Sequence, residues 1–237
     1  MQYQVFIFLL GFQFLGFSAL FEGCATLPQM SKPNSQKEKQ LQAEILGNKL
    51  AACFEPTLHF KDNSLILNYL SHLGQSLVDF NSELKGSRVI VKIVQNSLGK
   101  WKSYVLPGTR IYLPLGALKQ LTYENEVAAL VAIQLGHLVE SQKEGSFSEK
   151  SEKSEAQEKR TFQVAVQILY EAGYDARGII SLLTLYLNHP DYSPYSMSLV
   201  SSLIDFSWHE VAVYAPLRNP ITNSENFVQM RKRIEQL

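Results

Sequence analysis

The stretch from Thr122 to Gln142 constrains the fold of this chain more than any other. Its apolar residues recur every three or four positions, as in a helix with one buried face. Glu124 and Glu126 add negative charge at the amino-terminal end, where the helix dipole favours it. The residues on the expected buried face are Val127, Leu130, Val131, Gln134, Leu135 and Leu138. The pattern predicts one long amphipathic helix that packs against the rest of a domain.

Other segments predict a further helix and a small β-sheet. Leu65–Leu84 has apolar residues at helical spacing, and Arg88–Val94 is β-branched and partly alternating, which is typical of a strand. Ser103–Pro114 has the pattern of two short strands that flank the turn pair Pro107-Gly108. Ser141–Arg160 is rich in Ser, Glu, Lys and Gln, and its composition favours a solvated loop or a frayed helix. A helix is expected to resume at Thr161.

The run from Glu124 to His137, Glu-Asn-Glu-Val-Ala-Ala-Leu-Val-Ala-Ile-Gln-Leu-Gly-His, resembles the active-site helix of the HtpX-like and CAAX-prenyl-protease-like zinc metallopeptidases, metallopeptidase family forty-eight. Other segments resemble motifs of that family in the same order: Tyr69–Leu77, Ser103–Pro114, Glu171–Ala176, Arg218–Pro220 and Met230–Leu237. The resemblance covers roughly Leu65 to the carboxyl terminus. It implies an α+β, zincin-like metallopeptidase fold, mostly helical, with a small β-sheet beside the former active-site helix.

The chemistry of that family requires an HExxH motif, in which two His one helical turn apart hold zinc and the Glu takes a proton from zinc-bound water. This chain has Ile133-Gln134-Leu135-Gly136-His137 instead. Ile133 has no lone pair for a metal, and Gln134 cannot accept the proton. His137 is the only one of the three positions that matches, so we expect it to be a relic ligand in a chain without catalytic residues or a metal.

The resemblance also places the rest of the degenerate site. Counting back from Ala172 puts the third zinc ligand of the family at Arg160 and the Asp that orients the ligands at Phe162. The late His of the family falls at Asn219. A shift of one or two residues in this register would bring in Glu158, so whether Glu158 replaces the third ligand stays open.

The amino-terminal end predicts membrane targeting. Met1 to Phe21 contains no charged side chain, and the apolar run ends at Gly23-Cys24, which resembles a bacterial lipobox. We expect a signal peptide over residues 1–23, a lipidated Cys24 with a flexible tether over 24–42, and a metallopeptidase-like domain over 43–237. An ordinary cleaved signal and an uncleaved anchor are the alternatives. With Cys24 acylated, Cys53 is the only thiol, so no intramolecular disulfide is expected.

Charge excludes one class of partner. The chain has 22 Lys and Arg against 22 Asp and Glu, a formal net charge of zero, which gives no electrostatic basis for binding nucleic acid.

The resemblance to a lipoprotein implies a location in the cell envelope, with the lipid in a bacterial membrane and the domain in the periplasm. The partners that this location offers are envelope or outer-membrane proteins, an assembly machinery or a protease.

These observations together predict a membrane-anchored, catalytically inactive metallopeptidase-like protein that binds envelope proteins or a partner protease in the former cleft. In the family, the hairpin edges the cleft, and an extended segment can add to it as a strand. The edge residues here would be Tyr104, Val105, Leu106, Pro107 and Gly108. One alternative is an active zinc metalloendopeptidase with a rearranged site, and a second is a structural lipoprotein.

Overall fold

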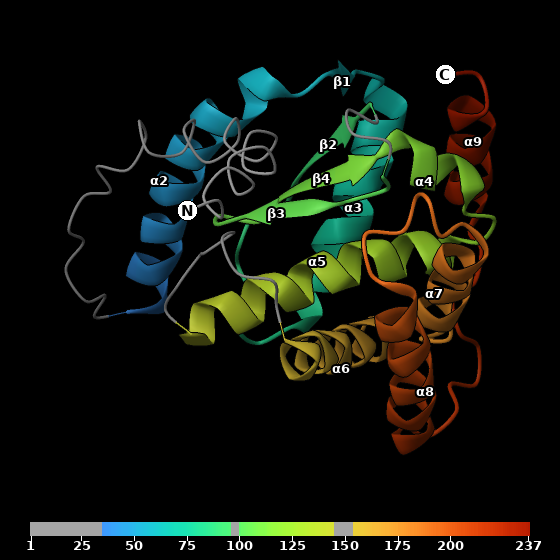
Figure 1. Ribbon diagram of the computed structural model, residues 1–237. Coiled ribbons are helices and arrows are strands. Elements are labelled where there is room, and N and C mark those ends of the chain that lie inside the picture. The colour runs from blue at the N-terminus through green and yellow to red at the C-terminus, as the bar shows by residue number, and fades with distance from the viewer. Residues whose placement is uncertain (1–34, 96–99, 145–153) are drawn as a thin grey trace, which may run out of the picture.

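The computed structural model describes residues 35–95, 100–144 and 154–237. Its central element is α5 (Glu124–Glu144), which runs between a sheet on one side and a group of helices on the other (Figure 1). The sequence predicted one buried face for this helix. In fact Ala128, Ala129 and Ala132 are as buried as the predicted apolar positions, because α5 is covered on opposite sides by different elements.

The sheet is small and mixed. Its strand order is β1 (Phe60–Lys61), β2 (Ile90–Val94), β4 (Arg110–Pro114), β3 (Tyr104–Leu106). The central pair β2–β4 is parallel, whereas β1 and β3 pair antiparallel at the two edges. The strand predicted within Arg88–Val94 is confirmed as β2. The hairpin predicted around Pro107-Gly108 is confirmed as β3 and β4. Three further elements complete this side: η1 (Glu55–Thr57), α3 (Ser64–Phe80) and α4 (Leu115–Gln120).

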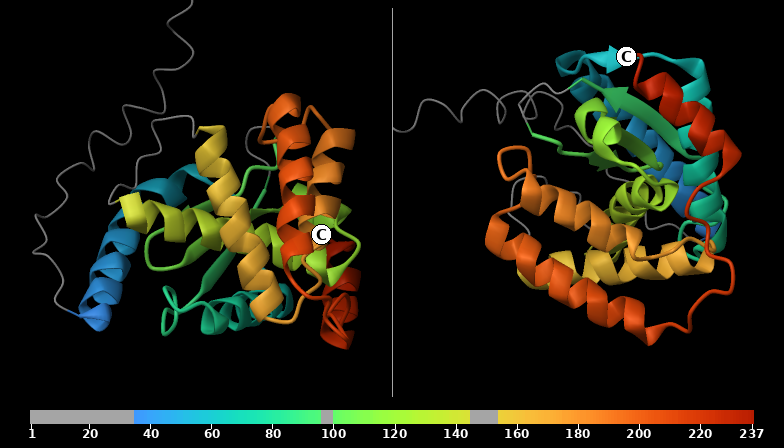
Figure 2. Two further views of the ribbon diagram at one scale, coloured as in Figure 1. Left: turned by 90° about the horizontal axis from the view of Figure 1, so that it is seen from below. Right: turned by 90° about the vertical axis from the view of Figure 1, so that its right-hand side faces the viewer.

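The opposite side of α5 is helical. Figure 2 shows α6 (Glu155–Glu171), α7 (Gly178–Asn188) and α8 (Met197–Val213) gathered there, away from the sheet. Helix α6 lies directly against α5, because a Cβ on Gly136 would lie 2.5 Å from the backbone oxygen of Thr161. The last helix, α9 (Glu225–Ile234), returns to pack against α3. The expected α+β class, mostly helical with a small sheet, is confirmed.

Two boundaries differ from the sequence-based expectation in the middle of the chain. The helix expected to reach Leu84 ends at Phe80, since the side-chain oxygen of Asn81 accepts hydrogen bonds from the backbone N–H groups of Glu83 and Leu84 and forms a turn. In the region expected to be loop, α6 already begins at Glu155. Ser154 and Gln157 form a reciprocal capping box there, which starts the helix despite its polar composition.

The amino-terminal boundary also differs. Residues 36–42, expected in the tether, belong to α2 (Gln36–Phe54). Ser35 caps this helix by accepting from the backbone N–H of Glu38, and the Gln, Lys and Glu residues that follow are good helix formers. The expected signal peptide and Cys24 lie outside the described residues. Cys53, expected to be a thiol, is disulfide-bonded in the structure, so the expectation that no disulfide forms is wrong. Among the described helices, none combines the length and apolarity that a membrane crossing requires.

Candidate functional site

His137 lies on α5 where that helix faces α6. Its Nδ1 is 3.2 Å from the hydroxyl oxygen of Thr161, and its Nε2 is 3.7 Å from the Oε2 of Glu158. The side chains of His137 and Glu158 are only 12% and 7% exposed. We call His137, Glu158 and Thr161 the His137 cluster. It joins α5 to the first turns of α6.

Tyr195 belongs to the loop between α7 and α8 and packs beside this cluster. Its ring contacts Phe162 and Tyr186 edge-on, with centroids 6.2 Å apart in both pairs. Burial, and next the negative charge of Glu158, raise the pKa of the Tyr195 phenol well above its usual value. The phenol is therefore neutral at physiological pH. This position of Tyr195 was not predicted, because no local sequence pattern indicates that a loop residue reaches α6.

The two degenerate positions before His137 lie inside the protein. Ile133 is 2% exposed and belongs to the main apolar core, and Gln134 is 6% exposed. An apolar side chain at position 133 fills the space one helical turn before His137. The helix therefore presents a packed surface where the HExxH motif would present a second imidazole and a carboxylate.

The other predicted site residues do not converge on His137. Arg160 donates from Nε to the Oε2 of Glu140 at 3.0 Å, and its side chain is half exposed. Phe162 is fully buried, and Asn219 is exposed between α8 and α9. The carboxylate that approaches His137 is that of Glu158, the residue left open by the motif register.

A zinc ion at this position would need three protein ligands from His, Cys, Asp or Glu. The described residues contain no group of three such side chains that could hold a metal ion. His137 and Glu158 supply two donors, while Ile133 can supply none and Thr161 offers only a hydroxyl. The described donor set therefore does not fit the zinc that the family resemblance implies.

The predicted cleft edge, Tyr104 to Gly108, lies at the edge strand β3 and in the turn to β4. One end of it is tied to the helical side of the molecule. The backbone N–H of Trp101, just before β3, donates to the carbonyl of Tyr192 in the α7–α8 loop at 2.8 Å. The two rings stack with centroids 4.9 Å apart and planes at 11°. The loop that carries Tyr195 is thus held next to the start of β3.

The amino-terminal end of α5 is fixed by a buried carboxylate. Glu124 is 3% exposed and accepts a hydrogen bond from the Tyr69 hydroxyl at 2.7 Å. Burial, followed by the charge of Glu124, raises the pKa of Tyr69, and the same causes raise the pKa of Tyr174 to about 12. The backbone N–H of Glu124 donates to the side chain of Asn223 at 3.0 Å. Glu124 therefore holds α5 against α3 and the segment before α9, beyond its expected effect on the helix dipole.

Comparison with known proteins does not identify a family for this chain. A scan against models of protein families found no match. A search of curated proteins found no match either. The motifs that resemble family forty-eight therefore support a proposal about this protein and do not establish its membership.

Proposed function

We propose that this chain is a membrane-anchored, catalytically inactive protein with a zincin-like fold, related to the family forty-eight metallopeptidases, that binds extended segments of envelope proteins. A partner protease is the other client that this proposal allows. The observation that carries it is the pair of buried residues Ile133 and Gln134, which precede His137 on α5 in place of a zinc ligand and a general base.

The loss of catalytic rate expected from these two substitutions favours binding over hydrolysis. Loss of a general base typically costs about 10² to 10⁴ in rate. Loss of the metal removes both the Lewis acid and the activated water. Gln134 cannot accept the proton, and Ile133 cannot hold the ion. A chain with both changes would retain the shape of a peptide-binding site without the means to cleave what it binds.

The edge strand β3 is the element that suits an extended client. Among the residues that the structure describes, it pairs with β4 alone and is the last strand in the sheet order. A segment in extended conformation can add to such an edge through backbone hydrogen bonds, which depend little on the client's sequence. This property suits a protein that would meet many unfolded envelope proteins.

A photo-crosslinking amino acid placed at Val105 should test the proposal. We expect an unfolded outer-membrane protein, diluted from denaturant, to crosslink at this position at least about tenfold more than at a matched position, a factor that corresponds to about 1.4 kcal/mol. Trp208 is the control, because it is 51% exposed on α8, on the other side of α5. Equal crosslinking at both positions would contradict binding at β3, and no crosslinking at either would favour a structural lipoprotein.

The active metallopeptidase with a rearranged site is favoured by one observation, the 3.7 Å approach of Glu158 to His137. Elemental analysis of the purified chain distinguishes it from the binding protein. One tightly bound zinc per chain, with hydrolysis of casein that a chelator stops, would establish the alternative. The binding proposal expects substoichiometric zinc and no such hydrolysis.

Membrane attachment should depend on Cys24, which lies outside the described residues. We expect the wild-type chain to carry acyl groups and to enter the detergent phase, because two or more acyl chains anchor a protein stably. Cys24→Ala should lose both properties, whereas the control Lys49→Ala, at an exposed position of α2, should keep them. Intact-mass analysis checks this prediction. A lipid still present on Cys24→Ala would rule it out.

A further inference from the structure

Helix α2 crosses the turn of the β3–β4 hairpin at two glycines. A Cβ on Gly47 would collide with the carbonyl oxygen of Pro107. On the hairpin side, Gly108 has a positive φ of 73°, and a Cβ there would lie 2.9 Å from the Cα of Glu44. The helix backbone and the hairpin backbone therefore touch directly, and this contact is possible only without side chains at residues 47 and 108.

The two halves of α2 are held in different ways. Its buried residues are Gly47, Ala51 and Phe54, all in the carboxyl-terminal half. Phe54 is the only large one among them, and its ring packs edge-on against Tyr104 and Tyr112 with centroids 5.2 and 5.3 Å away. This half of the helix is anchored in the second apolar cluster of the molecule.

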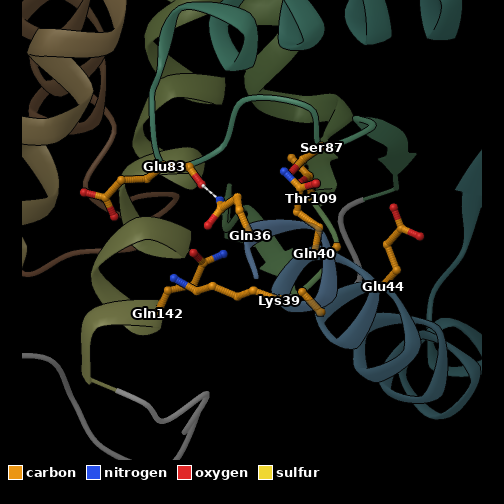
Figure 3. Close-up of a pocket in the computed structure, with 10 residues that line it drawn as sticks. Gln36, Lys39, Gln40, Glu44, Glu83, Ser87, Thr109 and Gln142 are labelled. Carbon is orange, nitrogen blue, oxygen red and sulfur yellow. Dashed lines mark hydrogen bonds between the residues drawn. The ribbon is translucent and has the colours of Figure 1, made fainter. Parts of the chain in front are cut away.

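The amino-terminal half of α2 is held by polar contacts. Gln36 donates from its amide to the backbone carbonyl of Glu83 at 3.1 Å, and Gln40 donates to that of Lys85 at 2.6 Å. Figure 3 shows these side chains along a polar hollow between α2 and the segment after α3. Leu41 and Ile45 are 56% and 41% exposed. Since exposed hydrogen bonds exchange with water at little net cost, this half is the less firmly attached.

We propose that α2 is a strap that swings about Phe54, and that its release uncovers the hairpin turn for a partner. In the closed position the helix covers the carbonyl of Pro107 and the backbone of Gly108. Release exposes these groups at the end of β3, where an extended segment needs room to continue past the strand. The identity of the partner as an extended client segment rests on the proposed function, whereas the swing of α2 itself does not.

Hydrogen exchange of the full-length chain tests the strap with the variant Gly47→Ala. The added methyl group should force α2 off the hairpin and speed amide exchange in residues 36–47 and 104–110 by about tenfold or more, a factor that corresponds to about 1.4 kcal/mol. Exchange in α5 should not change. Ala favours a helix more than Gly does, so faster exchange in α2 cannot come from weaker intrinsic helicity.

Two further variants complete the test. Lys49→Ala, at an exposed position of the same helix, is the matched control and should leave all rates as in the parent. The pair Gln36→Ala and Gln40→Ala loosens the strap without any steric clash, and it should give the same pattern as Gly47→Ala if that variant folds poorly. In both loosened variants, crosslinking of the unfolded probe at Val105 should rise several-fold.

The results separate the strap from the proposed function. If α2 exchanges only together with α5 in the parent and in both loosened variants, there is no strap. If α2 exchanges faster while residues 104–110 stay protected, α2 does not cover the hairpin and the inference is overturned. If both segments open but the probe crosslinks to no variant, the strap stands and the proposed client binding fails. If the parent crosslinks and the loosened variants do so no better, α2 does not restrict access and the inference is overturned.

Discussion

The double substitution Ile133→His and Gln134→Glu should raise the zinc content of the purified chain from substoichiometric to about one ion per molecule, the content of a complete three-ligand site. The substitution places a second imidazole one helical turn before His137, on a helix that the rest of the fold already holds in place. The third donor would be Glu158, whose carboxylate is 3.7 Å from His137. Elemental analysis after dialysis measures the outcome.

Two added substitutions identify the third donor. In the double variant, Glu158→Gln should abolish stoichiometric zinc because an amide is a poor zinc ligand. Arg160→Gln is the matched control and should leave the zinc content unchanged, since the Arg160 side chain pairs with Glu140. The register counted from the sequence motifs instead places the third ligand at residue 160. If that register held, zinc content would depend on residue 160 and not on Glu158. Zinc that survives Glu158→Gln would therefore contradict the assignment made from the structure.

Zinc binding by the double variant should not by itself restore proteolysis. The resemblance places the orienting Asp at Phe162, and the structure buries that ring against Tyr195. Hydrolysis of casein should stay at the rate of the parent chain, although the ion is bound. A chelator-sensitive protease would show that neither the missing Asp nor Asn219 limits the reaction.

Phe162→Ala should have the largest effect on stability among the site residues. The side chain is fully buried in the main core, so its truncation leaves a cavity and should lower the free energy of unfolding by about 3 to 5 kcal/mol. Urea unfolding followed by circular dichroism measures the change. Phe80→Ala is the control, because Phe80 is 58% exposed and its truncation should change the same quantity by no more than about 0.5 kcal/mol.

Phe162→Asp extends the same test to the chemistry of the site. An unpaired carboxylate in a fully buried position should be more costly than the cavity, and the variant should unfold at a lower urea concentration than Phe162→Ala. If Phe162→Asp were as stable as the parent, a polar environment would have to exist at this position, and the site would be closer to the family arrangement than the packing around Tyr195 indicates.

Local sequence patterns were sufficient for the elements in which periodicity and turn residues agree. The long helix α5, the strand β2 and the hairpin around Pro107-Gly108 all follow from spacing and turn chemistry within a few residues. The difference from the HExxH motif of the family that the chain resembles is also read locally, since Ile133, Gln134 and His137 lie on one helix. None of these conclusions needed to know which segments lie next to each other.

The tertiary structure decided the arrangements that depend on distant segments. The close approach of α6 to α5 at Gly136 brings Glu158 and Thr161 to His137 and turns Arg160 toward Glu140. The α7–α8 loop brings Tyr195 to Phe162, and Gly47 lets α2 lie on the hairpin. From composition alone, residues 36–42 were predicted to be a tether and residues 155–160 a loop. Both segments are helical, because Ser35 caps the start of α2 and Ser154 caps the start of α6. The physical reason is that a side chain's neighbours across an interface are fixed by how backbones pack, and a pattern within one segment contains no information about that register.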